Sequence, residues 1–190
     1  MFLVNDLITL LAANLILSQA LGTSTIFIAA GGKKNLVATA FVITFFTTAG
    51  ASAAYLIDLM LPTTVSELRL LLYTAVIGVL YVLLLTALYF LGGSRFEELR
   101  RYVHVSAFNC AVMGTLFTVH ERSVMDGLMY SFAEYAGAGL EAGVGFIIAA
   151  LMLTAAYSKL NSSKVPASFR GFPAMLVYLG IISMAVYSLK

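Results

Sequence analysis

The sequence contains no tryptophan, a single cysteine, three prolines and few charged residues. One cysteine excludes an internal disulfide, and alone it cannot hold a metal cluster. Only 11% of the residues are charged, against about 25% in soluble domains, while 61% are hydrophobic. A soluble chain of 190 residues cannot bury so much apolar surface. The composition therefore predicts an all-α polytopic membrane protein.

Six apolar segments are suited to cross a bilayer, which takes about 20 residues a span. We expect them at residues 2–30, 35–61, 70–91, 105–119, 127–153 and 173–189. Six spans with short loops leave no room for a soluble domain. The chain is therefore expected to form a single integral membrane domain over residues 1–190.

The positive charges sit on one side of this arrangement. The loops after the first, third and fifth spans hold eight of the eleven Lys and Arg residues: Lys33, Lys34, Arg95, Arg100, Arg101, Lys159, Lys164 and Arg170. The other side receives only Arg69, Arg122 and Lys190. Because basic loops stay in the cytoplasm, both termini are expected outside.

The first and fourth predicted spans are short or broken. Gly22 and the hydroxyl run Thr23–Thr25 interrupt the first span, because such residues disfavour a helix interior. The fourth span has about 15 residues, or about 22 Å, against a bilayer core of about 30 Å. Short or broken helices at matching positions of two halves indicate a central site.

The two halves of the chain match weakly. In this alignment Cys110 corresponds to Ser24. Since each half has three spans, an odd number, the halves would have opposite orientation, as two inverted three-helix repeats at about 1–92 and 102–190. The alternative is a chance match of two Ala/Gly-rich segments. The glycine-rich second and fifth spans are expected to form an inner pair.

Polar residues within the spans are candidates for function. Glu134 and Glu141 are seven residues apart and share a helix face, so they could handle ions or protons. The alternative places Glu134 at the membrane interface and pairs Glu141 with a neighbouring subunit. The amides of Asn14, Gln19 and Asn109 are expected to support the helix breaks.

Other charged residues are assigned to the membrane surface. Asp58 is expected to be an interfacial residue, and His104 and His120, at opposite ends of a span, are too far apart to share a metal. The stretch SRFEELRRYVH predicts a short amphipathic helix that anchors the chain or docks a cytoplasmic partner. We find no nucleic-acid-binding signature, phosphate loop or catalytic triad.

Four stretches resemble a known family: NLILSQALG followed by Ser24, then KKNLVATAF, FNCAVMG and VPASFRG. They are similar to the membrane subunits of the Rnf and Nqr electron-transport complexes, on the A/E side of that family. The resemblance runs nearly end to end. It implies a multi-pass protein of the bacterial or archaeal cytoplasmic membrane, with six spans in two inverted repeats.

The resemblance also implies partners and a cofactor. The family works as a pair of homologous six-helix subunits within a larger complex, in which the two share a [2Fe-2S] cluster near the midplane. Electrons cross the membrane through that cluster, coupled to ion movement. Cys110 matches the second-repeat ligand. The first-repeat pattern Leu-Gly-x-Cys-Pro reads Leu21, Gly22, Thr23, Ser24 and Thr25 here, so Ser24 replaces a cysteine.

The sequence thus leaves two functions open. The first is a membrane subunit of an Rnf/Nqr-like ion-translocating oxidoreductase, not a catalyst by itself, with Cys110 and either Ser24 or a partner residue at the cluster. The second is a cluster-free relative that transports or conducts ions through Glu141 and Thr23–Thr25, or is purely structural.

Overall fold

The fold was analysed in a computed structural model that describes residues 15–61, 66–91, 93, 96–127 and 130–187. Within these residues the secondary structure is entirely helical, as the composition predicts. The helices are α2 (Leu15–Gln19), α3 (Thr23–Ala30), α4 (Lys33–Met60), α5 (Ser66–Leu91), α6 (Phe96–Ala107), α7 (Cys110–Met125), α8 (Phe132–Leu160) and α9 (Phe172–Tyr187). Among the predicted site residues, Asn14 lies outside the described part of the chain.

Three helices are long and apolar enough to cross a bilayer: residues 34–60, 68–90 and 132–160. Helices α6 and α7 qualify together as a fourth span, bent by 43° at a short break. Helix α9 is apolar but has only 16 residues. The described residues thus provide three to four candidate spans by length and composition, in agreement with a multi-pass membrane protein.

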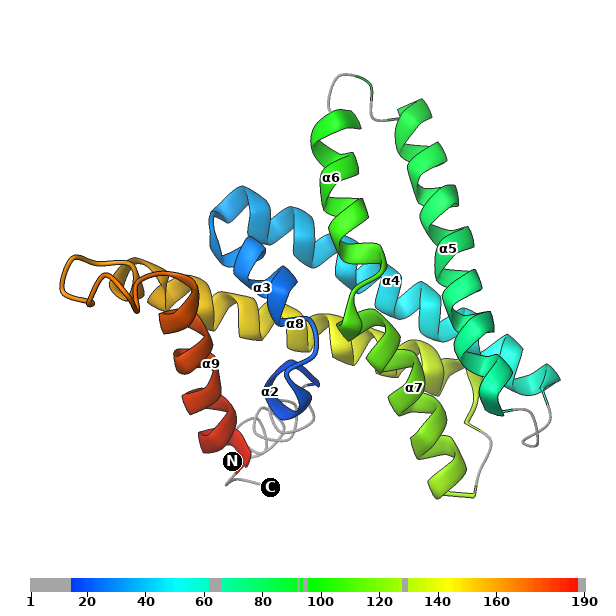
Figure 1. Cartoon of the computed structure of the whole chain (residues 1–190). Helices are drawn as coiled ribbons and strands as arrows, with labels where there is room; N and C mark the ends of the chain where they lie inside the picture. Colours follow the sequence, from blue (N-terminus) through cyan, green and yellow to red (C-terminus); the bar gives the residue numbers. More distant parts are fainter. Residues whose placement is uncertain (1–14, 62–65, 92, 94–95, 128–129, 188–190) are drawn as a thin grey trace.

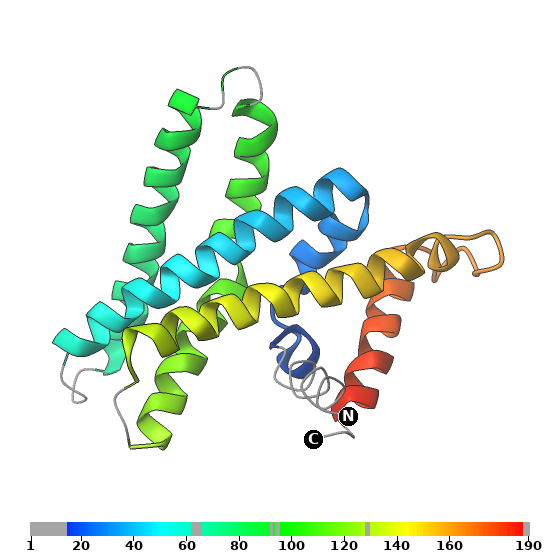
Figure 2. The ribbon, with the colours of Figure 1, turned by 180° about the vertical axis from the view of Figure 1, so that it is seen from behind.

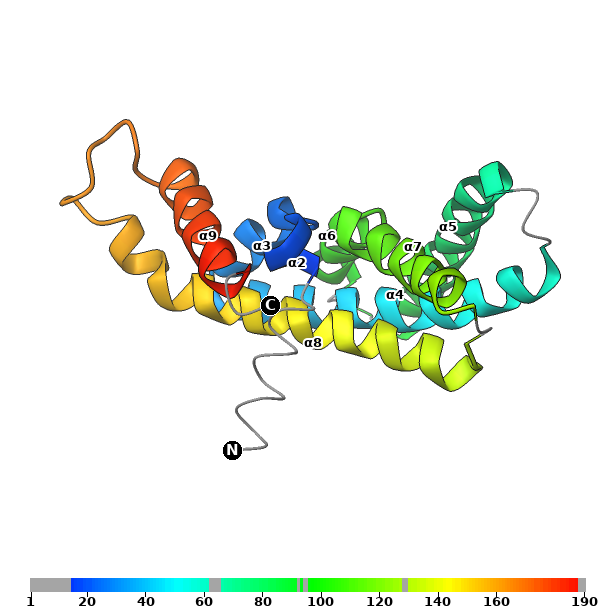
Figure 3. The same cartoon turned by 90° about the horizontal axis from the view of Figure 1, so that it is seen from below.

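The long helices α4 and α8 run antiparallel and form the spine of the molecule (Figures 1 and 2). They make the most extensive helix contact in the described structure, which confirms that the second and fifth predicted spans pack together. Seen from below, the remaining helices lie on one side of this spine (Figure 3).

Glycines set the close approach of this inner pair. A Cβ atom on Gly139 would lie 2.5 Å from the Thr47 backbone oxygen, and one on Gly143 would lie 2.7 Å from the Thr44 side chain. Thr44 and Thr47 satisfy their hydroxyls within α4, by donating to backbone carbonyls one turn earlier. The contact therefore depends on backbone proximity, as small residues allow in membrane helices.

Two hydrophobic cores lie along the spine. The first joins α2, α3 and α9 to the C-terminal half of α8, around Ile26, Phe146 and Leu153. The second joins α5, α6 and α7 to α4 and the start of α8, around Phe46 and Leu116. Helix α5 is mostly exposed on this chain: only 11% of its most apolar 18-residue stretch is buried. Most of its surface is therefore left for lipid or another subunit.

The fourth predicted span is wrong in its boundaries. Residues 105–107 are not its start but the end of α6, and the chain breaks at Phe108 and Asn109 before α7 begins. The described part of the amphipathic stretch, residues 96–104, is therefore continuous with residues 105–107 in one helix. Asn109 explains the break, because its side-chain oxygen accepts the backbone N–H of Ala111 and caps α7. The fifth span begins at Phe132 instead of 127, at a capping box of Ser131 and Glu134.

The first span is interrupted where expected, between α2 and α3. Gly22 caps α3 in a left-handed conformation, with φ of 79°, which favours glycine. A Cβ atom there would also lie 2.8 Å from the Ala111 Cβ at the start of α7. The two helix breaks are therefore in direct contact, although they are far apart in the sequence.

Replacing Asn109 with alanine is expected to lower the free energy of unfolding by about 1–2 kcal/mol, because it removes the cap of α7. It also removes the bond that the Asn109 amide donates to the Thr25 hydroxyl, at 2.7 Å. Asn109→Ser keeps a capping oxygen and is expected to lose less, as is Thr25→Val, which removes only the hydroxyl. Thermal unfolding in detergent, followed by circular dichroism, measures the difference. Equal losses for Asn109→Ala and Asn109→Ser would rule out a capping role.

Candidate functional site

The structure brings the two sequence-predicted ligand positions to neighbouring helix starts. Cys110 is the first residue of α7, and Ser24 is the second residue of α3. Asn109, just before Cys110, bonds to Thr25, just after Ser24. The side chains of Cys110 and Ser24 are both exposed on this chain. They are therefore accessible to a partner subunit, and neither is core filler.

The donor set of this chain is incomplete for a metal centre. Among the described residues, no three His, Cys, Asp or Glu side chains lie close enough to hold a metal ion. A [2Fe-2S] cluster normally takes four cysteine thiolates. Cys110 fits one of those positions, whereas Ser24 offers a hydroxyl. The remaining ligands would have to come from another chain.

Glu134 and Glu141 line the same small groove between α7 and α8, of about 300 Å³, together with Arg122 and Tyr130. The expectation that the two acids share a helix face is thus met. Glu134 also accepts the backbone N–H of Ser131, which ties it to the start of α8. At the rim, the Asp126 carboxylate accepts the Tyr130 hydroxyl and raises the pKa of that phenol.

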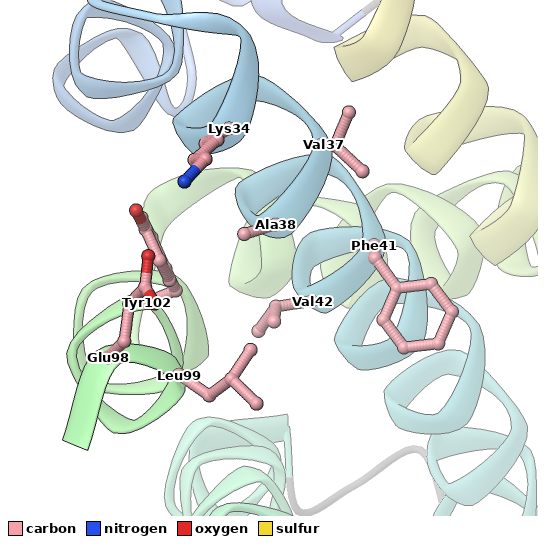
Figure 4. Close-up of a pocket in the computed structure, with 8 residues that line it drawn as sticks. All are labelled: Lys34, Val37, Ala38, Phe41, Val42, Glu98, Leu99 and Tyr102. Carbon is pink, nitrogen blue, oxygen red and sulfur yellow. The ribbon is translucent and has the colours of Figure 1, made fainter. Parts of the chain in front are cut away.

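A second, larger groove of about 770 Å³ opens between α4 and α6. Figure 4 shows Val42 of α4 pointing toward Leu99 of α6, and Lys34 pointing toward Glu98 and Tyr102. Val37 and Phe41 of α4 also line the groove. The Tyr102 hydroxyl donates to the Asn35 side chain at 2.7 Å, which ties the two helices together beside this groove. Cys110 and Ser24 do not line it.

The most developed polar arrangement lies elsewhere, in what we name the Asp58 cluster: Asp58, Arg69, Tyr73, His120 and Tyr135. The ends of four helices bring these residues together: the end of α4, the start of α5, the end of α7 and the start of α8 (Figure 1). Asp58 and Arg69 are 7% and 5% exposed. Asp58, which was expected to be an interfacial residue, is therefore buried among polar partners at the ends of these helices.

Every partner in the Asp58 cluster approaches the carboxylate. Arg69 Nε lies 3.2 Å from Oδ1, and His120 Nδ1 lies 3.1 Å from Oδ2. The Tyr73 hydroxyl lies 2.7 Å from Oδ1 and 2.8 Å from Oδ2, and the Tyr135 hydroxyl lies 2.7 Å from Oδ2. The cluster thus pairs a buried charge with an opposite charge and satisfies both carboxylate oxygens, as buried ions require.

A sequence feature could have revealed this cluster. Asp58 is the only charged residue in the predicted span 35–61, and Arg69 follows it 11 residues later. An acid in an apolar span is by default a functional hypothesis. Its position near the end of the span favoured the interfacial interpretation, and the contributions of α7 and α8 come from 60 or more residues later in the chain.

The other predicted residues do not join these sites. Gln19 ends α2 and is exposed. His104, on α6, contacts Tyr81 and Arg100, whereas His120 lies on α7 in the Asp58 cluster.

Comparison with known proteins agrees with the family resemblance. Residues 5–190 match the family described as "Rnf-Nqr subunit, membrane protein". The chain is 28% identical over 176 residues to the A-type subunit of the ion-translocating oxidoreductase complex of Aromatoleum aromaticum, and the match covers 92% of this chain and 85% of that relative. It is 23% identical over 174 residues to the A-type subunit of the Na(+)-translocating ferredoxin:NAD(+) oxidoreductase complex of Acetobacterium woodii, with 90% and 88% covered.

The chain is also similar to an E-type relative. It is 32% identical over 123 residues to the E-type subunit of the Na(+)-translocating NADH-quinone reductase of Chromohalobacter salexigens, and the match covers 65% of this chain and 57% of that relative. The sequence motifs thus predicted the family and its A/E side correctly.

Proposed function

The chain belongs to the Rnf-Nqr family of membrane subunits, and from this premise we propose that it is a subunit of an ion-translocating electron-transport complex. In this proposal it pairs with a homologous six-helix subunit, and it contributes Cys110 to an iron–sulfur cluster shared between the two. Ser24 or a partner residue takes the position of the missing cysteine. Such a cluster, when bound, carries one electron at a time.

The contact between the two helix breaks carries this proposal. The Asn109–Thr25 hydrogen bond and the close packing of Gly22 on Ala111 hold the starts of α7 and α3 together. Cys110 and Ser24 stand at those starts and are exposed. A ligand set shared between subunits requires exposed donors at a fixed spacing, and paired helix starts provide this arrangement.

The same contact supports the finer fold that we propose: six spans in two inverted repeats, about 1–92 and 102–190, with both termini outside. Each broken helix packs on the long helix of the other half, α3 on α8, and α6 and α7 on α4. Two further contacts also join the two halves: α2 packs against α9, and α6 packs against α5. The basic loops would then face the cytoplasm.

We keep a second function as the alternative, because Ser24 stands at a position where the family has a cysteine. Ser24 replaces the expected thiolate, so a cluster-free relative is the alternative. That relative would conduct ions, with Glu141 in its groove and the Thr23–Thr25 segment, or would be purely structural. The residues that line the Glu141 groove come from α7, α8 and the segment between them, and none comes from α3.

Iron content of the purified complex distinguishes the two functions. The shared-cluster proposal expects iron and visible absorbance in the wild-type complex, and loss of both in Cys110→Ala. Ser24→Ala is compared with Ser158→Ala, which alters an exposed serine of α8 and is expected to keep all iron. A smaller iron content in Ser24→Ala alone would assign the hydroxyl as a ligand.

The opposite results are equally informative. A wild-type complex without iron, or a Cys110→Ala complex with unchanged iron, would reject the cluster and leave the alternative. A genome in which no neighbouring gene encodes a homologue with both cysteines would also favour the alternative. Co-purification with a homologous subunit is a separate measurement, and its failure would reject the subunit proposal itself.

A further inference from the structure

We propose that His120 is a proton-binding site, in which Nε2 takes up the proton because Asp58 holds the imidazole in a single tautomer. The site lies on the same helix as Cys110, ten residues further along α7, and it does not depend on iron. Its ligand is a proton from water, and binding converts neutral imidazole to imidazolium without any redox step.

The geometry of the Asp58 cluster fixes the tautomer. A carboxylate offers about four acceptor positions and no donor when ionised. Four donors approach Asp58: Arg69 Nε, the hydroxyls of Tyr73 and Tyr135, and His120 Nδ1. Because an ionised carboxylate can only accept hydrogen bonds, Nδ1 can bond to Asp58 only by donating. The hydrogen of the neutral ring therefore sits on Nδ1, and Nε2 keeps its lone pair.

Nε2 is then the basic atom that the cluster leaves available. Arg69 is a permanent donor, and the two tyrosine hydroxyls already donate to Asp58. The acceptor positions of Asp58 are filled, so a proton on it would displace one of the four donors. A neutral imidazole has one ring nitrogen that can accept a proton, and in this tautomer that nitrogen is Nε2.

His120 is the more exposed member of its contact with Asp58, as a residue that exchanges a proton with its surroundings must be. The side chain of His120 is 18% exposed, whereas those of Asp58 and Arg69 are 5% and 6% exposed. The ring is therefore partly open at the surface of this chain, while the ion pair behind it stays covered. Proton uptake changes the charge of the cluster from zero to plus one, where the ends of α4, α5, α7 and α8 meet.

The charged surroundings of His120 come from all four helices. Asp58 faces it from α4, Arg69 and Tyr73 lie behind that carboxylate on α5, and Tyr135 completes the cluster from α8. Glu121 and Arg122 follow on its own helix, and Arg122 lines the groove that holds Glu134 and Glu141 of α8. The site lies at the helix ends opposite the basic loops. There, proton exchange would face the side that we expect to be outside.

Nitrogen NMR of the intact chain tests this site. The chain has two histidines, so His104→Gln leaves His120 as the only one. With ¹⁵N-histidine labelling in detergent, we expect one tautomer at pH 8, with hydrogen on Nδ1 and a bare Nε2. Lowering the pH to 5 is expected to add one proton to Nε2. Hydrogen on Nε2 at pH 8, or no uptake by pH 5, would overturn the proposal.

Two variants in the His104→Gln background show whether Asp58 sets the tautomer. Asp58→Asn introduces an amide that can donate to Nδ1, so the single tautomer is expected to be lost. Asp126→Asn changes an exposed carboxylate at the C-terminal cap of α7, the helix that carries His120, and is expected to keep the single tautomer. An unchanged tautomer in a folded Asp58→Asn protein would contradict the role of Asp58. The parent spectrum decides the proposal even if that variant does not fold.

Discussion

Asp58→Ala is expected to lower the free energy of unfolding by about 3–5 kcal/mol, the largest loss among the substitutions considered for this chain. The substitution leaves the Arg69 guanidinium, which is 5% exposed, without its opposite charge. It also leaves the hydroxyls of Tyr73 and Tyr135 without the acceptor that both use. The free-energy penalty of a buried charge without a partner is larger than the net stabilisation that the ion pair provided. Thermal or SDS unfolding in detergent micelles measures the loss.

Graded controls separate charge burial from general damage. Tyr135→Phe removes one hydrogen bond to a charged group and is expected to cost about 1.5–3 kcal/mol. Tyr89→Phe changes an exposed tyrosine of α5, and Glu121→Ala removes an exposed carboxylate of α7 near the same cluster. Both are expected to be near neutral, within about 0.5 kcal/mol. If Asp58→Ala is no worse than Glu121→Ala, the cluster does not stabilise the helix ends.

Gly139→Ala is expected to destabilise the protein by about 1–3 kcal/mol or more, through overpacking of the α4–α8 contact. The new Cβ would lie 2.5 Å from the Thr47 carbonyl oxygen and 2.7 Å from the Thr48 Cα. Both atoms belong to the backbone of α4, so the two long helices must move apart. The separation would also loosen both hydrophobic cores, since each includes residues of both α4 and α8.

Gly137 provides the matched control on the same helix. A Cβ there meets no atom within 4 Å, so Gly137→Ala is expected to be neutral or to gain up to about 1 kcal/mol in helix propensity. Gly143→Ala, facing Thr44 at 2.7 Å, is expected to behave like Gly139→Ala. Similar unfolding curves for Gly137→Ala and Gly139→Ala would refute close backbone packing. The curves are compared in the same detergent.

The sequence predicted features that depend on local chemistry. Gly22 and its hydroxyl neighbours predicted a helix break, and the structure has one between α2 and α3. The glycine-rich segments predicted the inner pair, because small side chains are needed wherever two helix backbones approach closely. The motif around Cys110 predicted the family.

Local chemistry was insufficient where a residue acts through distant partners. Asn109 was expected to support a break in a short or broken fourth span, but the boundaries of that span were placed at residues 105 and 119, whereas the described helices run from Phe96 to Ala107 and from Cys110 to Met125. The break depends on Asn109 capping α7 and bonding to Thr25, 84 residues away in the sequence. The sequence therefore predicted the break, but not the helix boundaries around it or the contact with Thr25.

Composition and motifs by themselves determined that this chain is a helical membrane protein of the Rnf-Nqr family. Both are properties of the linear sequence, so they do not depend on how the helices pack. Only the tertiary structure decided the environment of each polar side chain. Asp58 lies at a span end in the sequence, yet Arg69, Tyr73, His120 and Tyr135 converge on it from three other helices. Burial and pairing of a charge are set by neighbours in space, so the sequence could locate the acid but not the cluster around it.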